Sequence, residues 1–375
     1  MNIAIVGGGH IGTTLSCYIK NAAPEHKVSL YVRKPERFQN PVKCNDLEHM
    51  SSWFARLDLI SNDPSVVIPE ADLIFIAQPH FLIESVFAII SPFVRKGAFV
   101  CVMPGCGGCE FMFRKFFGEG ITLLGFQRVP FTAKLVEYGK ETNLKSWKPF
   151  SVIGTIKGGD LDEGCKRIEA CKLNTKKASN YLAVTLAPSN PVLHTARTYQ
   201  LFSKWPPEHR FSEKCKFYVG WTDETSRTML AVDGELHALL DALPEIDSSS
   251  IRPLTEHYES PTVEDMTRKI NSIATFQTVY APMIPAVDDP SAFVADRSSR
   301  MFIEDFPWGL AIIRGFCEII GTPAPTMDKL LSWYADYMGL EWYMDGKFCG
   351  KDLAGTGIPQ NYGIHTKEEL LSYYI

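Results

Sequence analysis

The chain has 375 residues, of which 45% are hydrophobic and 22% charged, and its formal net charge is −5. These values are typical of a globular protein with two domains, and they argue against a general nucleic-acid binder. No apolar run is long enough to span a membrane and a predicted strand already includes residue 3, so we expect a cytoplasmic enzyme without a signal peptide.

The first predicted element is an apolar strand over residues 2–6, which runs into Gly7-x-Gly9-x-x-Gly12 and then into a helical pattern. This order is typical of the Rossmann turn that binds a dinucleotide pyrophosphate. Gly7 permits the tight turn, Gly9 lets the backbone approach the phosphates, and Gly12 lets helix and strand pack closely. We predict that His10 and Ile11 join the three glycines in the cofactor site, because N–H groups at the helix start face the anion. The alternative is an ordinary glycine-rich turn.

The second predicted strand, residues 27–32, ends at Arg33. A site for NAD usually has Asp or Glu there to bind the ribose 2′-hydroxyl. The basic segment Arg33-Lys34-Pro35-Glu36-Arg37 suits a 2′-phosphate instead, because Arg can bind a phosphate through two parallel hydrogen bonds. We therefore predict a preference for NADP(H), with NAD(H) not excluded. The alternative is a solvated basic turn.

Three more predicted strands, residues 72–77, 98–103 and 121–126, alternate with helical patterns and predict a doubly wound, mostly parallel sheet. The strand at 72–77 is almost continuously apolar, as in parallel strands that are covered on both faces. Ligands bind beyond the carboxyl ends of such strands. We therefore predict that Gln78 and the Met103-Pro104-Gly105 turn line the cofactor site; simple turn chemistry is the alternative.

The second half of the chain has little strand signal, and we place a domain boundary near residue 182. The predicted architecture is an α/β Rossmann domain at 1–182, followed by a mainly α-helical substrate domain at 183–375. Helical patterns cover 222–243 and 307–320, and the second of these ends at Gly321. Another helix is predicted to begin at Thr326, which can cap its own helix, and to end at Gly339.

Ten cysteines are scattered along the chain, which fits reduced and mostly buried thiols. Cys106-Gly107-Gly108-Cys109 has the spacing of a metal or redox pair, but no second pair with matching spacing accompanies it. We therefore predict no metal site.

Two segments of the second half carry candidate catalytic residues. An enzyme that uses nicotinamide needs a proton-transfer group and, for acidic substrates, cations that bind carboxylates. If the residues after Pro191 are helical, His194 and Arg197 share a face and pair a proton donor with a carboxylate clamp. The alternative is a histidine that bonds a nearby backbone carbonyl.

In the second segment, Arg300 and Asp305 precede a strongly apolar helix. Arg300 is a candidate for binding a substrate carboxylate through two hydrogen bonds. Asp305 is either an N-terminal helix cap or the carboxylate that orients and charge-stabilises His194, and the spacing leaves both open.

Four short motifs, in this order, resemble segments of the opine dehydrogenases, the octopine and nopaline dehydrogenase family. They are Pro130-Phe131-x-Ala133-x-x-x-Glu137-Tyr138-Gly139, Asn190-Pro191-x-x-His194, Arg300-x-x-x-x-Asp305-x-Pro307-x-Gly309-Leu310 and Gly321-Thr322-Pro323-x-Pro325-Thr326-x-Asp328. The resemblance implies that the amine of an amino acid and a 2-oxo acid form an imine, which NAD(P)H reduces. In that reaction His194 transfers the proton with Asp305 as its partner, and Arg300 and Asn190 bind substrate.

Two other functions stay open from the sequence. One is an NADPH-dependent reductase of a 2-oxo or 3-hydroxy acid similar to ketopantoate reductase, for which Lys269 would be the proton donor. The other is a protein that senses NADP(H) without turnover. The expected partners are small-molecule substrates, with no nucleic acid and no membrane. No heptad predicts an interface, so a homodimer is left open.

Overall fold

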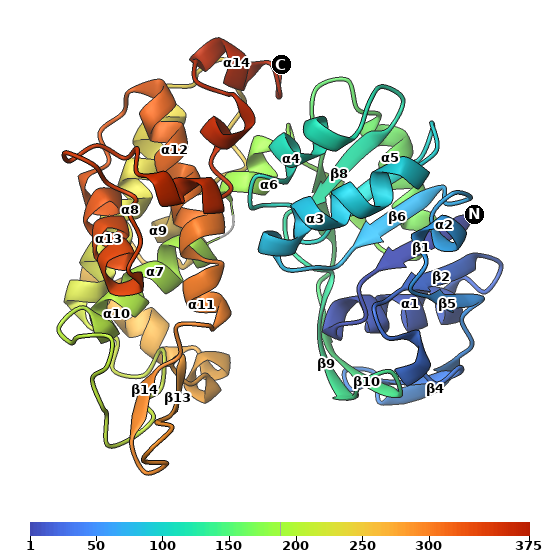
Figure 1. The fold of residues 1–375 in the computed structure, drawn as a ribbon, viewed down its shortest axis with the longest axis horizontal. Coiled ribbons are helices and arrows are strands. Elements are labelled where there is room, and N and C mark those ends of the chain that lie inside the picture. Colours follow the sequence, from blue (N-terminus) through green and yellow to red (C-terminus); the bar gives the residue numbers. More distant parts are fainter. Residues whose placement is uncertain (188) are drawn as a thin grey trace. The chain divides into compact units, whose positions relative to one another are not determined.

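The computed structural model describes residues 1–187 and 189–375, which form two compact units (Figure 1). The first unit contains residues 1–187 together with Ser372–Ile375, and the second contains the described residues up to Leu371. The predicted helical domain covered residues 183–375. In the structure, residues 183–187 and 372–375 belong to the first unit instead. Helix α6 (Leu182–Leu186) packs on strand β11 (Ser151–Gly154), and Tyr374 donates a hydrogen bond to Glu110, so both segments stay with the first unit.

An eight-stranded sheet forms the centre of the first unit, in the order β12-β11-β8-β7-β6-β1-β2-β5. Its other strands are β1 (Asn2–Val6), β2 (Lys27–Tyr31), β5 (Leu59–Ser61), β6 (Leu73–Ile76), β7 (Phe99–Val102), β8 (Thr122–Phe126) and β12 (Thr175–Lys177). Neighbouring strands are parallel except β8 and β11. The predicted doubly wound, mostly parallel sheet is therefore confirmed. Every residue of β6 and β7 is buried, as expected for central parallel strands.

The helices of the first unit connect these strands. They are α1 (His10–Ala22), α2 (Pro64–Val67), α3 (His80–Ile90), α4 (Cys109–Phe116) and α5 (Leu161–Ala170), with short 3₁₀ turns η1 (Pro35–Arg37) and η2 (Ser91–Phe93). Their apolar faces complete a core around Ile5, Leu30, Phe75 and Leu124, all of them fully buried.

A second, four-stranded sheet was not predicted from the sequence. It has the order β4-β3-β10-β9 and contains β3 (Val42–Asp46), β4 (Ser51–Ala55), β9 (Phe131–Glu137) and β10 (Glu141–Trp147). β3 and β10 are parallel partners although about a hundred residues separate them in the chain. Helix α1 packs against this sheet as well. The segment that resembled a family motif, residues 130–139, thus forms an outer strand of this sheet.

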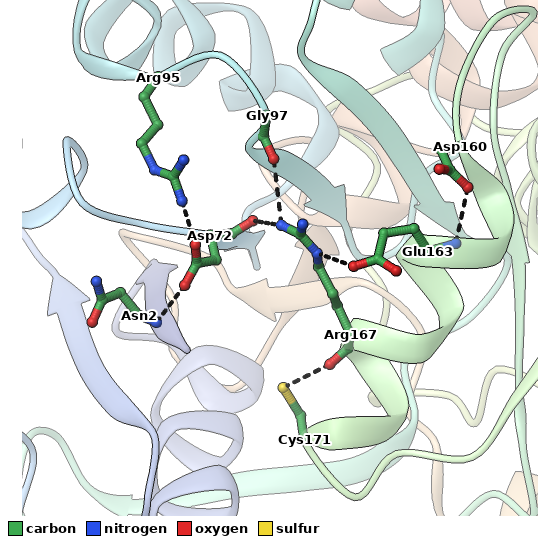
Figure 2. Close-up of polar contacts among 8 residues, drawn as sticks. All are labelled: Asn2, Asp72, Arg95, Gly97, Asp160, Glu163, Arg167 and Cys171. Carbon is green, nitrogen blue, oxygen red and sulfur yellow. Dashed lines mark hydrogen bonds and ion pairs between the residues drawn. The ribbon is translucent and has the colours of Figure 1, made fainter.

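Hydrogen bonds at the amino ends of the strands connect helix α5 to the main sheet (Figure 2). Asp72, directly before β6, accepts hydrogen bonds from the Asn2 N–H group and from the guanidinium of Arg95. Arg167 of α5 donates to the carbonyl oxygens of Asp72 and Gly97, at 3.2 and 3.3 Å, and its guanidinium also lies over the Phe99 ring. These hydrogen bonds stabilise the end of the sheet opposite the glycine turn.

The second unit is mainly helical, as predicted. Its helices are α7 (Asn190–Phe202), α8 (Asp223–Asp241), α9 (Leu254–His257), α10 (Val263–Ser272), α11 (Arg300–Ile303), α12 (Ala311–Ile320), α13 (Pro325–Met338) and α14 (Lys367–Leu371). Shorter turns are η3 (Ala274–Thr278), η4 (Phe306–Leu310), η5 (Lys351–Gly355) and η6 (Pro359–Tyr362), and β13 (Met283–Pro285) pairs with β14 (Phe293–Ala295).

Glycines end two of these helices where the sequence predicted it. Gly321 and Gly339 have φ angles of +81° and +71°, which close α12 and α13 in the left-handed conformation. Thr326, in contrast, does not cap its own helix. The carboxylate of Glu235 on α8 accepts hydrogen bonds from the N–H groups of Thr326 and Met327 instead. Among the described residues, no helix has the length and apolar character needed to cross a membrane.

Candidate active site

The glycine turn after β1 has the geometry that its sequence predicted. Gly7 has φ +122°, and a Cβ atom there would lie 2.6 Å from the carbonyl oxygen of Ala77. A Cβ atom on Gly12 would lie 1.9 Å from the carbonyl oxygen of Gly7. Larger residues at either position would therefore force the turn apart. Apart from the chain neighbours of Gly9, no atom of the described residues lies within 4 Å of the corresponding point on Gly9, which leaves its backbone approachable.

The start of helix α1 is open to an anion. Gly9 is the N-cap residue, no side chain caps the helix, and no acidic residue lies in its first turn. The first hydrogen bond that closes the helix runs from Thr13 N–H to the Gly9 carbonyl. The helix thus has no internal acceptor for the N–H groups of His10, Ile11 and Gly12. Together with the positive end of the helix dipole, these groups fit the pyrophosphate of a dinucleotide.

Three other predicted cofactor residues lie around this turn or after the neighbouring strands. His10 is held by its side chain, because Nδ1 accepts the Leu135 N–H group at 3.0 Å. The Gln78 amide lies against Gly7, with Nε2 2.8 Å from the point that a Cβ atom of Gly7 would occupy. Arg33 follows β2 and its side chain is exposed. No hydrogen bond or ion pair joins this side chain to another described residue. Its guanidinium is available to a ligand.

The two candidate catalytic residues of the second unit contact each other directly. His194 on α7 has its Nδ1 atom 2.8 Å from Oδ2 of Asp305 and its Nε2 atom 2.8 Å from the hydroxyl of Tyr218. A carboxylate only accepts hydrogen bonds, so Nδ1 carries the proton of the neutral ring. Nε2 then accepts from the tyrosine hydroxyl. The side chains of His194 and Asp305 keep 14% and 17% of their exposure, which leaves the pair accessible to a substrate.

A close helix approach brings these residues together. Pro191 stands in the first turn of α7, and a Cβ atom on Gly309 would lie 2.8 Å from its Cγ atom. The turn η4, which contains Gly309, has π-helical hydrogen bonds, including one from Leu310 N–H to the Asp305 carbonyl. The Asp305 side chain does not cap this turn. It is directed to His194, which favours the second of the two roles that the sequence left open.

Tyr218 is the member of the site that sequence reasoning missed. It is buried and stacks on Phe276, with ring centroids 4.0 Å apart. Burial raises the pKa of its hydroxyl, and the nearby Tyr258 and Asp305 add to this effect. The group therefore stays protonated and can donate to His194. It lies in an irregular segment between α7 and α8, where no periodic pattern could have revealed it.

Arg197 has a different role from the predicted carboxylate clamp. The side chain is buried, and its guanidinium donates to the carbonyl oxygens of Phe217, Val219 and Gly220, the last two at 2.6 and 3.2 Å. Burial lowers its pKa to about 10. The prediction rested on His194 and Arg197 sharing one face of helix α7. That face is partly exposed at His194 but is buried at Arg197. Its bonds hold the segment that contains Tyr218.

The remaining two predicted substrate residues are accessible. Asn190 is exposed at the first turn of α7. Arg300 on α11 forms an ion pair with the buried carboxylate of Glu304, yet 66% of its side chain stays exposed. No cluster of three or more His, Cys, Asp or Glu side chains suited to a metal ion occurs in the described part of the chain.

Two family models match the chain. The model described as "NAD/NADP octopine/nopaline dehydrogenase, alpha-helical domain" matches residues 177–338, and the model described as "Ketopantoate reductase PanE/ApbA" matches residues 3–137. The first match covers the segment that contains His194, Tyr218 and Asp305.

Individual proteins resemble the chain over nearly its full length. It is 27% identical to tauropine dehydrogenase of Arabella iricolor, over 98% of this chain and 99% of that protein. It is 26% identical to opine dehydrogenase of Haliotis discus hannai, over 99% and 98%. Among solved structures, octopine dehydrogenase with NADH and L-arginine has the same fold, with a TM-score of 0.87, 22% identity, and coverage of 99% of this chain and 98% of that one.

Proposed function

Because the chain belongs to the octopine/nopaline dehydrogenase family of oxidoreductases, we propose that it joins the amine of an amino acid to a 2-oxo acid and reduces the resulting imine with NAD(P)H. The observation that carries the proposal is the position of His194, hydrogen-bonded to Asp305 on one nitrogen and to Tyr218 on the other. A cofactor-binding protein without turnover would not need such an arrangement.

His194 moves the proton in this proposal. The amino acid enters as an ammonium ion, and Nε2 accepts one of its protons in place of the Tyr218 hydroxyl hydrogen. The freed amine attacks the carbonyl carbon of the oxo acid, and a proton moves from the attacking nitrogen to the carbonyl oxygen, which becomes a hydroxyl group. The imidazolium returns the proton to the resulting hydroxyl group, which leaves as water and gives a protonated imine. A bound nicotinamide cofactor supplies the hydride that this imine carbon accepts.

Asp305 and Tyr218 position the imidazole for both proton transfers. The Asp305 carboxylate fixes the tautomer with the proton on Nδ1 and stabilises the imidazolium once it forms. Tyr218 holds Nε2 until a substrate replaces it. Neither residue gains or loses a proton in the net reaction, so an ammonium ion, an oxo acid and a hydride give a secondary amine and water.

Arg300 and Asn190 are the proposed substrate-binding residues. Amino acid and oxo acid each carry a carboxylate, and a guanidinium binds a carboxylate through two parallel hydrogen bonds. The exposed guanidinium of Arg300 lies five residues before Asp305 in the chain, so α11 brings a cation to the same segment that positions the imidazole. Arg197 is not included, because its donors are occupied by backbone carbonyls.

For the cofactor, we propose the three glycines, His10, Ile11 and Gln78 as the binding residues and NADP(H) as the preferred form. The preference is supported by the exposed Arg33 after β2, at the position where a site for NAD usually has Asp or Glu. Cytoplasmic location and a homodimer stay predictions, which cell fractionation and light scattering would test.

The test follows the oxidation of NADPH with pyruvate, with and without each member of a panel of amino acids. Oxidation that needs both substrates supports the proposal. Oxidation with an oxo acid alone would instead indicate a reductase of the ketopantoate type. In that case Lys269 would have to act as proton donor, although its ammonium lies 3.3 Å from the Glu259 carboxylate.

A variant tests the role of the imidazole. His194→Ala is expected to lower kcat by about 100-fold or more, because general acid–base catalysis is lost, while cofactor binding stays near normal. The matched control is His365→Ala, which removes an exposed histidine of the same unit. Unchanged turnover in His194→Ala would remove the residue from the mechanism.

A further inference from the structure

A thiol and an imidazole meet at the carboxyl ends of two neighbouring strands in the first unit. Sγ of Cys106, in the segment after β7, lies 3.2 Å from Nε2 of His80, the first residue of α3 after β6. Both side chains are largely buried, with 8% of Cys106 and 7% of His80 exposed. The reaction proposed above uses neither group.

The backbone around Cys106 is closely fitted and fixes this contact. Gly105 donates its N–H to the Phe126 carbonyl, and its own carbonyl accepts the Tyr181 hydroxyl at 2.8 Å. Gly107 has φ +83°, and a Cβ atom there would lie 2.7 Å from ring atoms of His80. The Gly107 backbone is thus packed against the imidazole. A side chain at this position would push the imidazole away from the thiol.

A second thiol is adjacent. Sγ of Cys109 donates a hydrogen bond to the carbonyl oxygen of Cys106 at 2.8 Å, so it is turned back toward that residue. Between them lie Gly107 and Gly108, with φ of +83° and +75°. Two consecutive glycines can change conformation easily, and they are the residues that must move for the two sulfur atoms to bond.

The other cysteines have different surroundings. Burial raises the pKa of Cys17 and Cys171 to about 12 and that of Cys317 to about 11, which keeps these thiols protonated and inert. Cys349 is exposed and serves as a reference for an accessible thiol. Sγ of Cys106, in contrast, has a hydrogen bond to an imidazole nitrogen. An imidazole gives the thiol proton an acceptor, and the thiolate is the reactive form.

We propose that Cys106 is a peroxide-reactive thiol, with His80 as its proton acceptor and Cys109 as the thiol that resolves the oxidised product. His80 Nε2 takes the thiol proton, and the thiolate attacks one oxygen of hydrogen peroxide. An S–O bond forms, the O–O bond breaks, and the departing hydroxide takes the proton from the imidazolium to leave as water. Sulfur is oxidised to a sulfenic acid and peroxide is reduced.

The second step closes a disulfide. The Cys109 thiol attacks the sulfenic sulfur of Cys106, a second water leaves, and an S–S bond forms. Two thiols and one hydrogen peroxide thereby give one disulfide and two waters. The change occurs close to the glycine turn, because Gln78, two residues before His80, lies against Gly7. Oxidation is therefore expected to weaken cofactor binding as well, if the cofactor site is the proposed one.

The test measures modification directly and does not depend on turnover. The full-length reduced protein is treated with substoichiometric hydrogen peroxide in the presence of dimedone, and mass spectrometry gives the rate of labelling at each cysteine. We expect Cys106 to be labelled at least tenfold faster than Cys349. In Cys109→Ser the dimedone adduct at Cys106 should increase, while the Cys106–Cys109 disulfide peptide found without dimedone should disappear.

His80→Asn tests the imidazole, and it is expected to lower the Cys106 rate by tenfold or more without changing the Cys349 rate. If this variant does not fold, the ratio of the labelling rates of Cys106 and Cys349 in the wild type still tests the proposal. Preferential labelling of Cys349, or equal rates at the two residues, would overturn the proposal. Labelling of Cys106 in a protein that lacks opine dehydrogenase activity would leave this inference standing and refute the proposed function alone.

Discussion

Glu110 on α4 offers a pH-dependent test of the packing in the first unit. Its side chain is fully buried, and Oε1 accepts hydrogen bonds from Thr185 at 2.5 Å and from Tyr374 at 3.0 Å. Oε2 has no partner in the described residues. Burial raises the pKa of this carboxyl from 4.5 to about 7, against the lowering effect of its hydrogen bonds.

The sign of the effect follows from the proton count. Between pH 4.5 and 7 the unfolded chain has lost this proton while the folded chain keeps it, so the stability that the protonated carboxyl provides declines as pH rises. One pKa unit corresponds to about 1.4 kcal/mol, so the free energy of unfolding should fall by roughly 2 to 3 kcal/mol between pH 5 and pH 8 because of this one group.

Glu110→Gln removes the titration and keeps the shape of the side chain. Urea unfolding of the wild type and the variant, measured at pH 5 and pH 8, should therefore show the variant gaining about 2 to 3 kcal/mol relative to the wild type as pH rises. Glu119→Gln, at an exposed position in the same unit, should leave the pH dependence unchanged. If the wild type and Glu110→Gln change in parallel, Glu110 is ionised in the folded protein and our account of its burial is wrong.

Three further substitutions test other features. Arg33→Asp should raise the Kd for NADPH at least about tenfold more than that for NADH, since only NADPH carries the 2′-phosphate; equal shifts in a fluorescence titration would contradict the cofactor preference. Gly309→Ala adds a methyl group 2.8 Å from Cγ of Pro191 and should push η4 away from α7, so kcat should fall by roughly tenfold while the cofactor Kd stays unchanged. A wild-type kcat in this variant would show that the close approach of η4 and α7 does not set the His194 geometry. Arg197→Met leaves buried carbonyls without donors and should lower the unfolding free energy by roughly 2 to 4 kcal/mol in urea titrations, whereas a loss of substrate affinity at normal stability would restore its predicted role.

The cofactor turn was predictable from the sequence because its determinants are local. Gly7 and Gly12 are five residues apart, and the positive φ of Gly7 and the approach of Gly12 to the Gly7 carbonyl both arise within one turn of strand and helix. The four-stranded sheet was missed for the opposite reason. β3 pairs with β10 from a distant part of the chain, and neither segment is apolar enough to predict a buried strand by itself.

The catalytic pair was predictable only in part. His194 and Asp305 are 111 residues apart, and their contact was expected from the family resemblance, since no local pattern joins them. Tyr218 could not be found, because it acts from an irregular segment whose position depends on Arg197. The helical periodicity correctly suggested a common face for His194 and Arg197, but it could not tell which part of that face is covered by other segments.

The last residues of the chain complete the unit that the first residues begin. Tyr374 supplies one of the two hydrogen bonds to the Glu110 carboxyl, and the Tyr373 carbonyl accepts the N–H group of Lys157. The interior of this half of the chain is therefore closed only once residues 372–375 are present. A recombinant fragment that stops at residue 187 would lack both contacts, so that half is better produced with residues 372–375 joined to it by a short linker.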